Sequence, residues 1–177
     1  MEFLDQLKSA ASQEQNLDWA NLSYYWENNE QINKNSQSEG RIIFMGDSIT
    51  EEWERLYPEF FQSPSFINRG IGGQTTPQML IRFKQDVINL NPQYVFLLAG
   101  TNDIAGNTGP SNIDMITNNI FSMAELSSYH DIKIIISSIL PVYKYPWAEH
   151  IANVPDTIES INKKIKKFTK THNIPYI

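Results

Sequence analysis

The stretch from Arg41 to Glu51 constrains the fold more than any other part of the sequence. It opens with five residues of strand character, breaks at Gly46-Asp47-Ser48, and continues with polar residues that lead to Trp53. An apolar run that stops at a glycine and restarts with helical character predicts a strand, a turn and a helix. Ser48 would then lie beside a helix N-terminus at the carboxyl end of a strand, where open α/β sheets bind ligands. Ser48 is therefore a candidate nucleophile, although serine at such a position commonly only caps the helix.

The same alternation of apolar runs and helical patterns continues along the chain. It predicts strands at residues 41–45, 65–68, 94–99, 133–140 and 174–177, and helices at 18–29, 76–90, 111–129 and 156–170. The run at 94–99 is apolar throughout, as expected for a parallel strand that is covered on both faces. The sequence thus predicts a three-layer α/β/α sandwich with a mainly parallel, doubly wound sheet of the flavodoxin type. We expect one domain over residues 17–177, preceded by a loosely ordered lead-in at 1–16.

Composition and charge exclude several classes of function. The chain has 177 residues, enough for one domain with a real core, and a formal net charge of −6, which argues against nucleic acid as the main partner. It contains no cysteine, so disulfides, thiolate metal sites and cysteine nucleophiles are excluded. No apolar run reaches the length of a membrane span, and the acidic residues near the start are unlike a signal peptide. We expect a cytoplasmic protein.

Three polar or glycine-rich turns follow three of the predicted strands, at 46–48, 72–74 and 100–103. In a parallel sheet, turns at the carboxyl ends share one edge. Ester cleavage by a serine requires a nucleophile and donors aimed at the developing oxyanion. Ser48 supplies the hydroxyl and a backbone N–H, Gly73 supplies a second backbone N–H, and the Asn102 side chain supplies a third donor. Gly70 or Gly72 could instead be the glycine that allows close approach.

Two acidic residues border this edge and allow two interpretations. Asp47 and Asp103 could form a carboxylate pair for metal or glycosidic chemistry, or they could bind backbone N–H groups in their own turns. The second role is commoner, so we expect both to support the turns and expect no metal.

At these residues the chain resembles the SGNH (GDSL) hydrolases. The segments FMGDSITEEW, INRGIGGQTTPQMLIRF and LLAGTNDIAGNTGP are similar to the first three sequence blocks of a bacterial acylhydrolase branch. The resemblance implies an esterase without metal or organic cofactor, with Ser48 as nucleophile, Gly73 and Asn102 as oxyanion donors, and Asp47 as a support. It also implies small acyl esters, including O-acetylated carbohydrates, as substrates.

The sequence departs from this family at the general base. The family's base is a histidine in an Asp-x-x-His segment after the last strand, and no such segment occurs in this sequence. We therefore expect a domain that is incomplete at its C-terminus and has little turnover. Among the three histidines, His150 is a weak candidate for a substitute base, whereas His130 and His172 suit helix ends. Tyr143, Tyr145 and Trp147 in the same loop as His150 either line a substrate pocket or cover the sheet edge.

Two other classes of function remain open. A non-catalytic ligand-binding protein would keep the crevice but lack the base. A phosphate-binding domain would use the glycine turns, but the lysine and spacing of a P-loop are absent. The sheet is expected to leave one edge uncovered, which favours a homo-oligomer.

Overall fold

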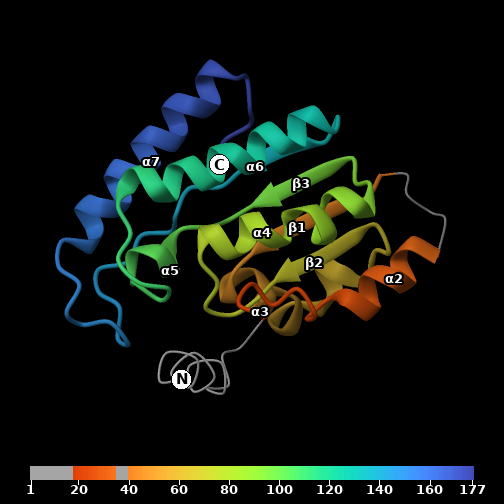
Figure 1. Cartoon of the computed structure of the whole chain (residues 1–177), viewed down its shortest axis with the longest axis horizontal. Helices are drawn as coiled ribbons and strands as arrows, with labels where there is room; N and C mark the ends of the chain where they lie inside the picture. The colour runs from red at the N-terminus through yellow and green to blue at the C-terminus, as the bar shows by residue number, and fades with distance from the viewer. Residues whose placement is uncertain (1–17, 35–39) are drawn as a thin grey trace, which may run out of the picture.

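The fold is a parallel sheet between layers of helices, as the computed structural model shows for residues 18–34 and 40–177. The predicted lead-in at 1–16 lies outside the described residues. The sheet has the strand order β2-β1-β3-β4, and every neighbouring pair is parallel. The strands are β1 (Ile42–Gly46), β2 (Phe66–Gly70), β3 (Tyr94–Leu97) and β4 (Lys133–Ile136). The predicted α/β/α class is confirmed (Figure 1).

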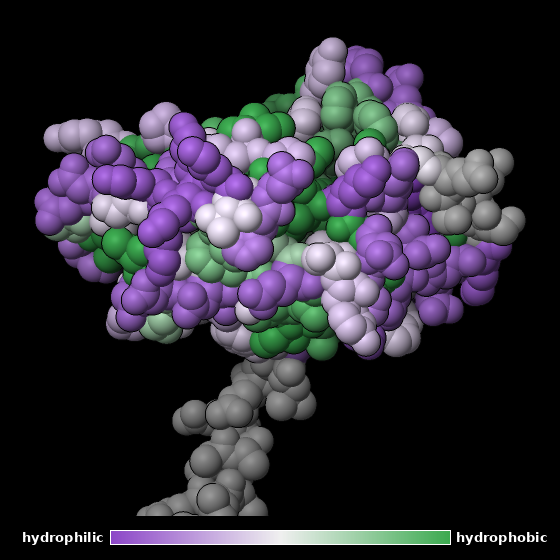
Figure 2. Space-filling view, turned by 90° about the horizontal axis from the view of Figure 1, so that it is seen from above, coloured by the Kyte–Doolittle hydropathy of each residue, from purple (hydrophilic) through white to green (hydrophobic). Residues whose placement is uncertain are grey.

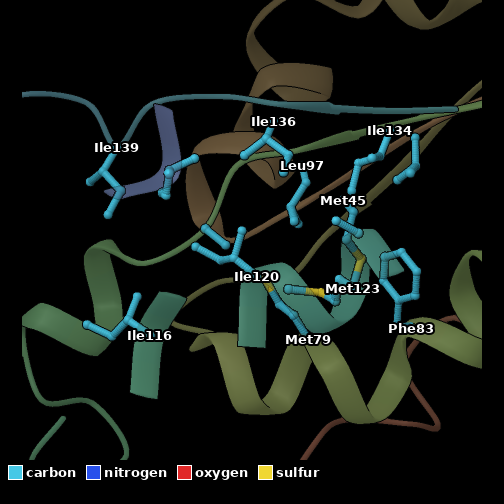
Figure 3. Packing of buried hydrophobic residues seen from close by; sticks show 14 of the residues in the cluster. Met45, Met79, Phe83, Leu97, Ile116, Ile120, Met123, Ile134, Ile136 and Ile139 are labelled. Atoms are coloured by element: carbon cyan, nitrogen blue, oxygen red, sulfur yellow. The ribbon is translucent and has the colours of Figure 1, made fainter. Parts of the chain in front are cut away.

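One face of the sheet packs against α4 (Thr76–Asp86) and α6 (Ile113–Tyr129). Alternate strand residues point into this layer, since successive side chains of a strand face opposite sides. Figure 3 shows the packing of Met45, Leu97, Ile134 and Ile136 from the strands against Met79, Phe83, Ile120 and Met123 from the helices. The last helix, α7 (Val154–Thr171), lies beside α6, where the Phe121 and Phe168 rings stack 3.8 Å apart.

The opposite face carries an aromatic cluster built on Phe44 of β1. Its ring makes edge contacts with Trp53 of α3 (Ser48–Leu56) and with Phe60 of the 3₁₀ helix η1 (Pro58–Gln62). Aromatic pairs in this geometry add stability beyond the area they bury. The cluster therefore fixes α3, and with it Ser48, against the sheet.

The N-terminal part of the described chain differs from the prediction. The helical spacing predicted a helix from Asp18, but residues 18–25 form turns and α2 spans only Trp26–Lys34. Asp18 caps a turn instead, because its carboxylate accepts hydrogen bonds from the backbone N–H groups of Leu22 and Ser23. The side chains of Gln74, Gln78 and Gln85 donate to the carbonyls of Ala20, Trp19 and Leu22. These tertiary bonds replace helical ones, so this segment, residues 18–25, forms a strap across the loop after β2 and across α4.

Smaller corrections concern helix caps and strand ends. Thr75, rather than Thr76, is the N-cap of α4, because Thr76 turns its side chain to Asp103. Asn112, rather than Ser111, caps α6, since its side chain accepts a 2.9 Å hydrogen bond from the Met115 N–H. The predicted fourth strand ends at Ile136 rather than 140.

The remaining elements are short. The helices η2 (Ile88–Leu90) and α5 (Thr101–Ile104) flank β3. Tyr176 pairs with Ile136 in a parallel bridge, which agrees with a strand beginning at 174–177. Figure 2 shows a face covered mainly by hydrophilic residues, with separate hydrophobic areas between them. None of the helices in the described ranges is long and apolar enough to cross a membrane.

Candidate active site

The turns after β1, β2 and β3 lie against one another at the carboxyl edge of the sheet. The Ile71 N–H donates to the Gly46 carbonyl over 3.1 Å, which joins the first turn to the second. The Asn102 side chain donates to the Gln74 carbonyl over 3.0 Å, which joins the second turn to the third. The parallel order β2-β1-β3 makes these contacts possible, because it places all three strand ends side by side.

Ser48 is the first residue of α3 and is partly exposed. Asp47 is the N-cap, and its carboxylate accepts a 2.9 Å hydrogen bond from the Ile49 N–H. The backbone N–H of Ser48 is one of the first-turn donors that have no acceptor inside the helix. A methyl group placed on Gly72 would lie 3.9 Å from Ser48 Cβ. The loop after β2 therefore approaches Ser48 closely, and it does so at Gly72.

Gly73 and Asn102 lie beside this contact, and Asn107 connects them. Gly73 has a φ of +74°, a left-handed conformation that favours glycine. The Asn107 side-chain amide donates to the Gly73 carbonyl over 3.0 Å and to Asn102 Oδ1 over 3.1 Å. Because Asn102 Oδ1 accepts this bond, its Nδ2 must point toward the Gln74 carbonyl, and one of its two hydrogens remains for another acceptor.

Asp47 and Asp103 are both buried under the turns. The pKa of Asp47 is raised to about 6, mainly by burial and in smaller part by the nearby Asp103 carboxylate, against the hydrogen bond from the Ile49 N–H. Burial also raises the pKa of Asp103, whose carboxylate accepts hydrogen bonds from the N–H and hydroxyl of Thr76. Asp47 thus binds a backbone N–H in its own turn, whereas the bonds between Asp103 and Thr76 reach the start of α4. Within residues 18–34 and 40–177, no group of three or more acidic or histidine side chains is arranged to hold a metal ion.

Sequence reasoning missed Arg82, which lies beneath the turns. Its side chain is fully buried and donates to the carbonyls of Gly46 (3.1 Å) and Arg69 (2.7 Å) and to Asp86 (3.0 Å). It also donates to the Gln74 side chain. Arg82 thereby joins the ends of β1 and β2 from below. The sequence did carry a signal for this role. Arg82 and Asp86 lie four residues apart in α4, a spacing that brings their side chains together on one side of the helix.

The loop after β4 reaches the same edge through two aromatic residues. Tyr145 is buried, and its hydroxyl lies 2.9 Å from the Thr101 hydroxyl. Trp147 is 62% exposed, and its indole N–H donates to Asn107 Oδ1 over 3.3 Å. Tyr145 therefore covers the sheet edge, whereas Trp147 borders the site. Tyr143 is 88% exposed and does neither.

The histidines differ in their surroundings. His150 is exposed in the loop after β4, and no described contact brings it to Ser48. His130 and His172 are the C-caps of α6 and α7, as their positions predicted. His172 also packs on the Phe168 ring at 4.1 Å.

Comparison with known proteins places this geometry in a family. The sequence pattern of the GDSL-like lipase/acylhydrolase family matches residues 44–177. A GDSL-like lipase from Bacteroides thetaiotaomicron has 44% identity and a TM-score of 0.86, over 89% of this chain and 77% of that one. The acetyl xylan esterase AlAXEase has the same fold at 24% identity, with a TM-score of 0.62 over 77% of this chain and 75% of that one.

A curated relative extends the comparison by sequence. The uncharacterized lipoprotein YqeF of Bacillus subtilis (strain 168) is 32% identical over 127 residues, which are 62% of this chain and 52% of that protein. The chain thus spans about half the length of this curated relative.

Proposed function

The chain belongs to the GDSL-like lipase/acylhydrolase family, and we propose that it is a serine esterase that cleaves small acyl esters through an acyl-Ser48 intermediate. The observation that carries the proposal is the meeting of the three turns, in which a methyl group placed on Gly72 would lie 3.9 Å from Ser48 Cβ. Its substrate is a small molecule.

In the proposed reaction, Ser48 Oγ gives its proton to solvent water and attacks the carbonyl carbon of the ester. The C–O bond to the alcohol then breaks and the alcohol leaves with a proton. A water molecule finally hydrolyses the acyl-Ser48 ester, which releases the acid and restores the Ser48 hydroxyl. The backbone N–H groups of Ser48 and Gly73 and the remaining Asn102 amide hydrogen donate to the oxyanion. Each donor of this kind contributes about 3 kcal/mol to transition-state stabilisation. Asp47 and Asp103 hold the turns that aim these donors, and Asn107 fixes the orientation of the Asn102 amide.

The weak point of this chemistry is the removal of the serine proton. None of the histidines follows an aspartate by three residues, and no described contact links His150 to Ser48. Without a base, a serine attacks slowly, and the remaining catalysis comes from the oxyanion donors and from binding. We propose that this chain hydrolyses esters at a low rate. The same observation favours the second candidate function, a ligand-binding protein that retains the crevice of an esterase.

The acyl group is proposed to be small, acetyl above all, and O-acetylated carbohydrates are the proposed natural substrates. A structural relative that is named as an acetyl xylan esterase motivates the choice of sugar acetates for testing. The cytoplasmic location remains a prediction from the sequence, and the Bacillus relative is named as a lipoprotein.

The first prediction concerns Ser48. A fluorophosphonate probe should label the wild-type chain at Ser48, and Ser48→Ala should lose both labelling and p-nitrophenyl acetate hydrolysis above background. Ser128→Ala, an exposed serine on α6, is the matched control and should retain both. Labelling with slow hydrolysis supports the esterase, whereas the absence of labelling supports the binding protein. A fast, Ser48-dependent rate would contradict the proposal of low turnover.

A further inference from the structure

The carboxylate of Glu51 borders Ser48 and has no role in the chemistry described above. Ser48 and Glu51 lie one turn apart on α3, so their side chains share a face of the helix. The methyl position on Gly72 that lies 3.9 Å from Ser48 Cβ lies only 3.0 Å from Glu51 Oε2. Both glycines of this loop, Gly72 and Gly73, are exposed. The Glu51 carboxylate therefore lies between Ser48 and an exposed part of the loop after β2.

Tyr24 holds this carboxylate in place. Its hydroxyl donates to Glu51 Oε1 over 2.6 Å, and this hydrogen bond raises the pKa of the tyrosine. The bond occupies Oε1 and leaves Oε2, the oxygen beside Gly72, with lone pairs for another donor. A carboxylate whose orientation is fixed in advance loses less entropy when it binds a ligand.

The strap at residues 18–25 in turn fixes Tyr24. Three glutamine side chains from the loop after β2 and from α4 donate to strap carbonyls, and the Tyr25 hydroxyl donates to the Gly70 carbonyl. The Arg69 guanidinium also lies 4.4 Å from the centre of the Tyr25 ring. The position of Tyr24 is thus determined by β2, by α4 and, through Gln74, by the loop that approaches Ser48.

An indole borders the site near the neighbouring glycine. Trp147 donates to Asn107, and Asn107 donates to the Gly73 carbonyl, so the exposed indole is tied to this glycine. Hydroxyl groups form short, charge-assisted hydrogen bonds with carboxylates, and the faces of sugar rings are apolar surfaces that suit an aromatic side chain. A carboxylate at this position would repel a negatively charged ligand, because like charges repel.

We propose that the Glu51 carboxylate, oriented by Tyr24, accepts hydrogen bonds from hydroxyl groups on the alcohol part of the substrate. The site then selects neutral, hydroxyl-bearing esters, such as partly acetylated sugars, over esters that lack hydroxyls or carry negative charge. This inference rests on the proposed esterase function and names Glu51 as its specificity determinant.

The test compares the initial rates of hydrolysis of two acetyl esters over a range of substrate concentrations. Methyl 2-O-acetyl-β-D-xylopyranoside carries free hydroxyls, and p-nitrophenyl acetate carries none. For Glu51→Gln, the ratio of kcat/KM for the sugar ester to kcat/KM for the phenyl ester should fall about tenfold or more, mainly through the KM of the sugar ester. Tyr24→Phe should lower the same ratio by a smaller factor.

Glu52→Gln is the matched control, because it makes the same change on the next residue of α3. Glu52 pairs with Arg55 and, unlike Glu51, does not come within 4 Å of the methyl position on Gly72, so its variant should keep the wild-type ratio. Equal losses for both esters in Glu51→Gln would show a structural role and overturn the proposal. An unchanged ratio would overturn it too.

A binding experiment separates this inference from the proposed function. If Ser48→Ala hydrolyses both esters as fast as the wild type, the esterase function fails, and the affinity for methyl β-D-xylopyranoside is measured by calorimetric titration. Binding that Glu51→Gln weakens at least fivefold, and Glu52→Gln does not, supports the hydroxyl-accepting site. Equal affinity in the wild type and Glu51→Gln, or no binding by the wild type, overturns it.

Discussion

Asp47, in the first of the three turns, stabilises the start of α3 but buries a carboxylate there. Its carboxylate accepts a hydrogen bond from Ile49 N–H at the start of α3, which favours the charged form. Burial is the larger effect, and it raises the pKa from 3.8 to about 6. The folded protein therefore holds a proton on Asp47 at a pH where the unfolded chain has already released it.

This shift predicts a pH dependence of stability. Between about pH 4 and pH 6 the folded state binds more protons at Asp47, so its contribution to the free energy of unfolding falls as the pH rises through that window. Asp47→Asn keeps an oxygen for Ile49 N–H and removes the charge. Its stability gain over the wild type should be about 1–2 kcal/mol larger at pH 8 than at pH 5. Urea unfolding at both pH values measures it.

Asp156→Asn provides the comparison for this measurement, since Asp156 is exposed in the first turn of α7. Asp156→Asn should change stability by about 0.5 kcal/mol or less at each of the two pH values, as is usual for substitutions at exposed positions. If Asp47→Asn changed the free energy of unfolding equally at the two pH values, the buried charge of Asp47 would not destabilise the folded state.

At the scale of residues, the sequence predicted which side chains face the carboxyl edge but not their partners. Ser48 and Asp47 follow an apolar strand, so their place was readable from the chain alone. Glu51 was not singled out, because its role depends on Tyr24, which is 27 positions away in the sequence. The partner of Asp103, Thr76, is equally distant. Contacts of this kind require the sheet order, which local patterns do not contain.

At the scale of elements, α2 is joined to β2 and α4 by a buried polar cluster. Asn29 donates to Asp86 over 2.7 Å and accepts from the Arg69 guanidinium, also at 2.7 Å. Arg82 completes the cluster through its ion pair with Asp86, in which both side chains are fully buried. Buried charges of this kind require every partner, because an unpaired one costs far more than the net value of a hydrogen bond.

Adjacent asparagines on α2 allow a matched test of this cluster. Asn29→Ala should lower the free energy of unfolding by about 1–3 kcal/mol, because it removes one buried hydrogen bond from Asp86 and the buried Asn29 oxygen that accepts from the Arg69 guanidinium. Asn28 is exposed and accepts a single 2.8 Å hydrogen bond from Arg69, so Asn28→Ala should cost clearly less. Thermal or urea unfolding measures both variants. Similar losses would mean that the cluster does not hold α2 in place.

The same cluster explains why the first helix was misplaced. The spacing of Trp19, Leu22 and Trp26 resembles an apolar helical stripe, yet all three side chains are exposed and Asn29 is the buried residue of α2. The helix is anchored by polar contacts rather than by an apolar face, and hydrophobic periodicity cannot detect such an anchor. The strands were predicted within a few residues, because short apolar runs such as 94–99, bounded by turn residues, are typical of parallel strands covered on both faces.

At the scale of the whole molecule, the parallel sheet and an uncovered edge could be predicted, but the strand order that decides which segment lies at that edge could not. The strand order β2-β1-β3-β4 leaves the segment at residues 174–177 outermost, beside β4. Its inward bonds come from Pro175 and Ile177, since the Ile136 N–H donates to the Pro175 carbonyl and the Ile177 N–H donates to Ile136. The intervening Tyr176 turns its backbone groups to the other side, where no described strand pairs with them.

An outward-facing strand edge is a template for pairing with another chain. We therefore predict that this chain self-associates with rising concentration, as measured by size-exclusion chromatography with light scattering. Tyr176→Pro removes the outward N–H donor and should shift the chain toward monomer. Tyr176→Ala loses the same ring contacts but keeps that N–H, so it should associate more than the proline variant does. A wild-type chain that stays monomeric up to several hundred micromolar, or two variants with equal masses, would contradict pairing through this edge.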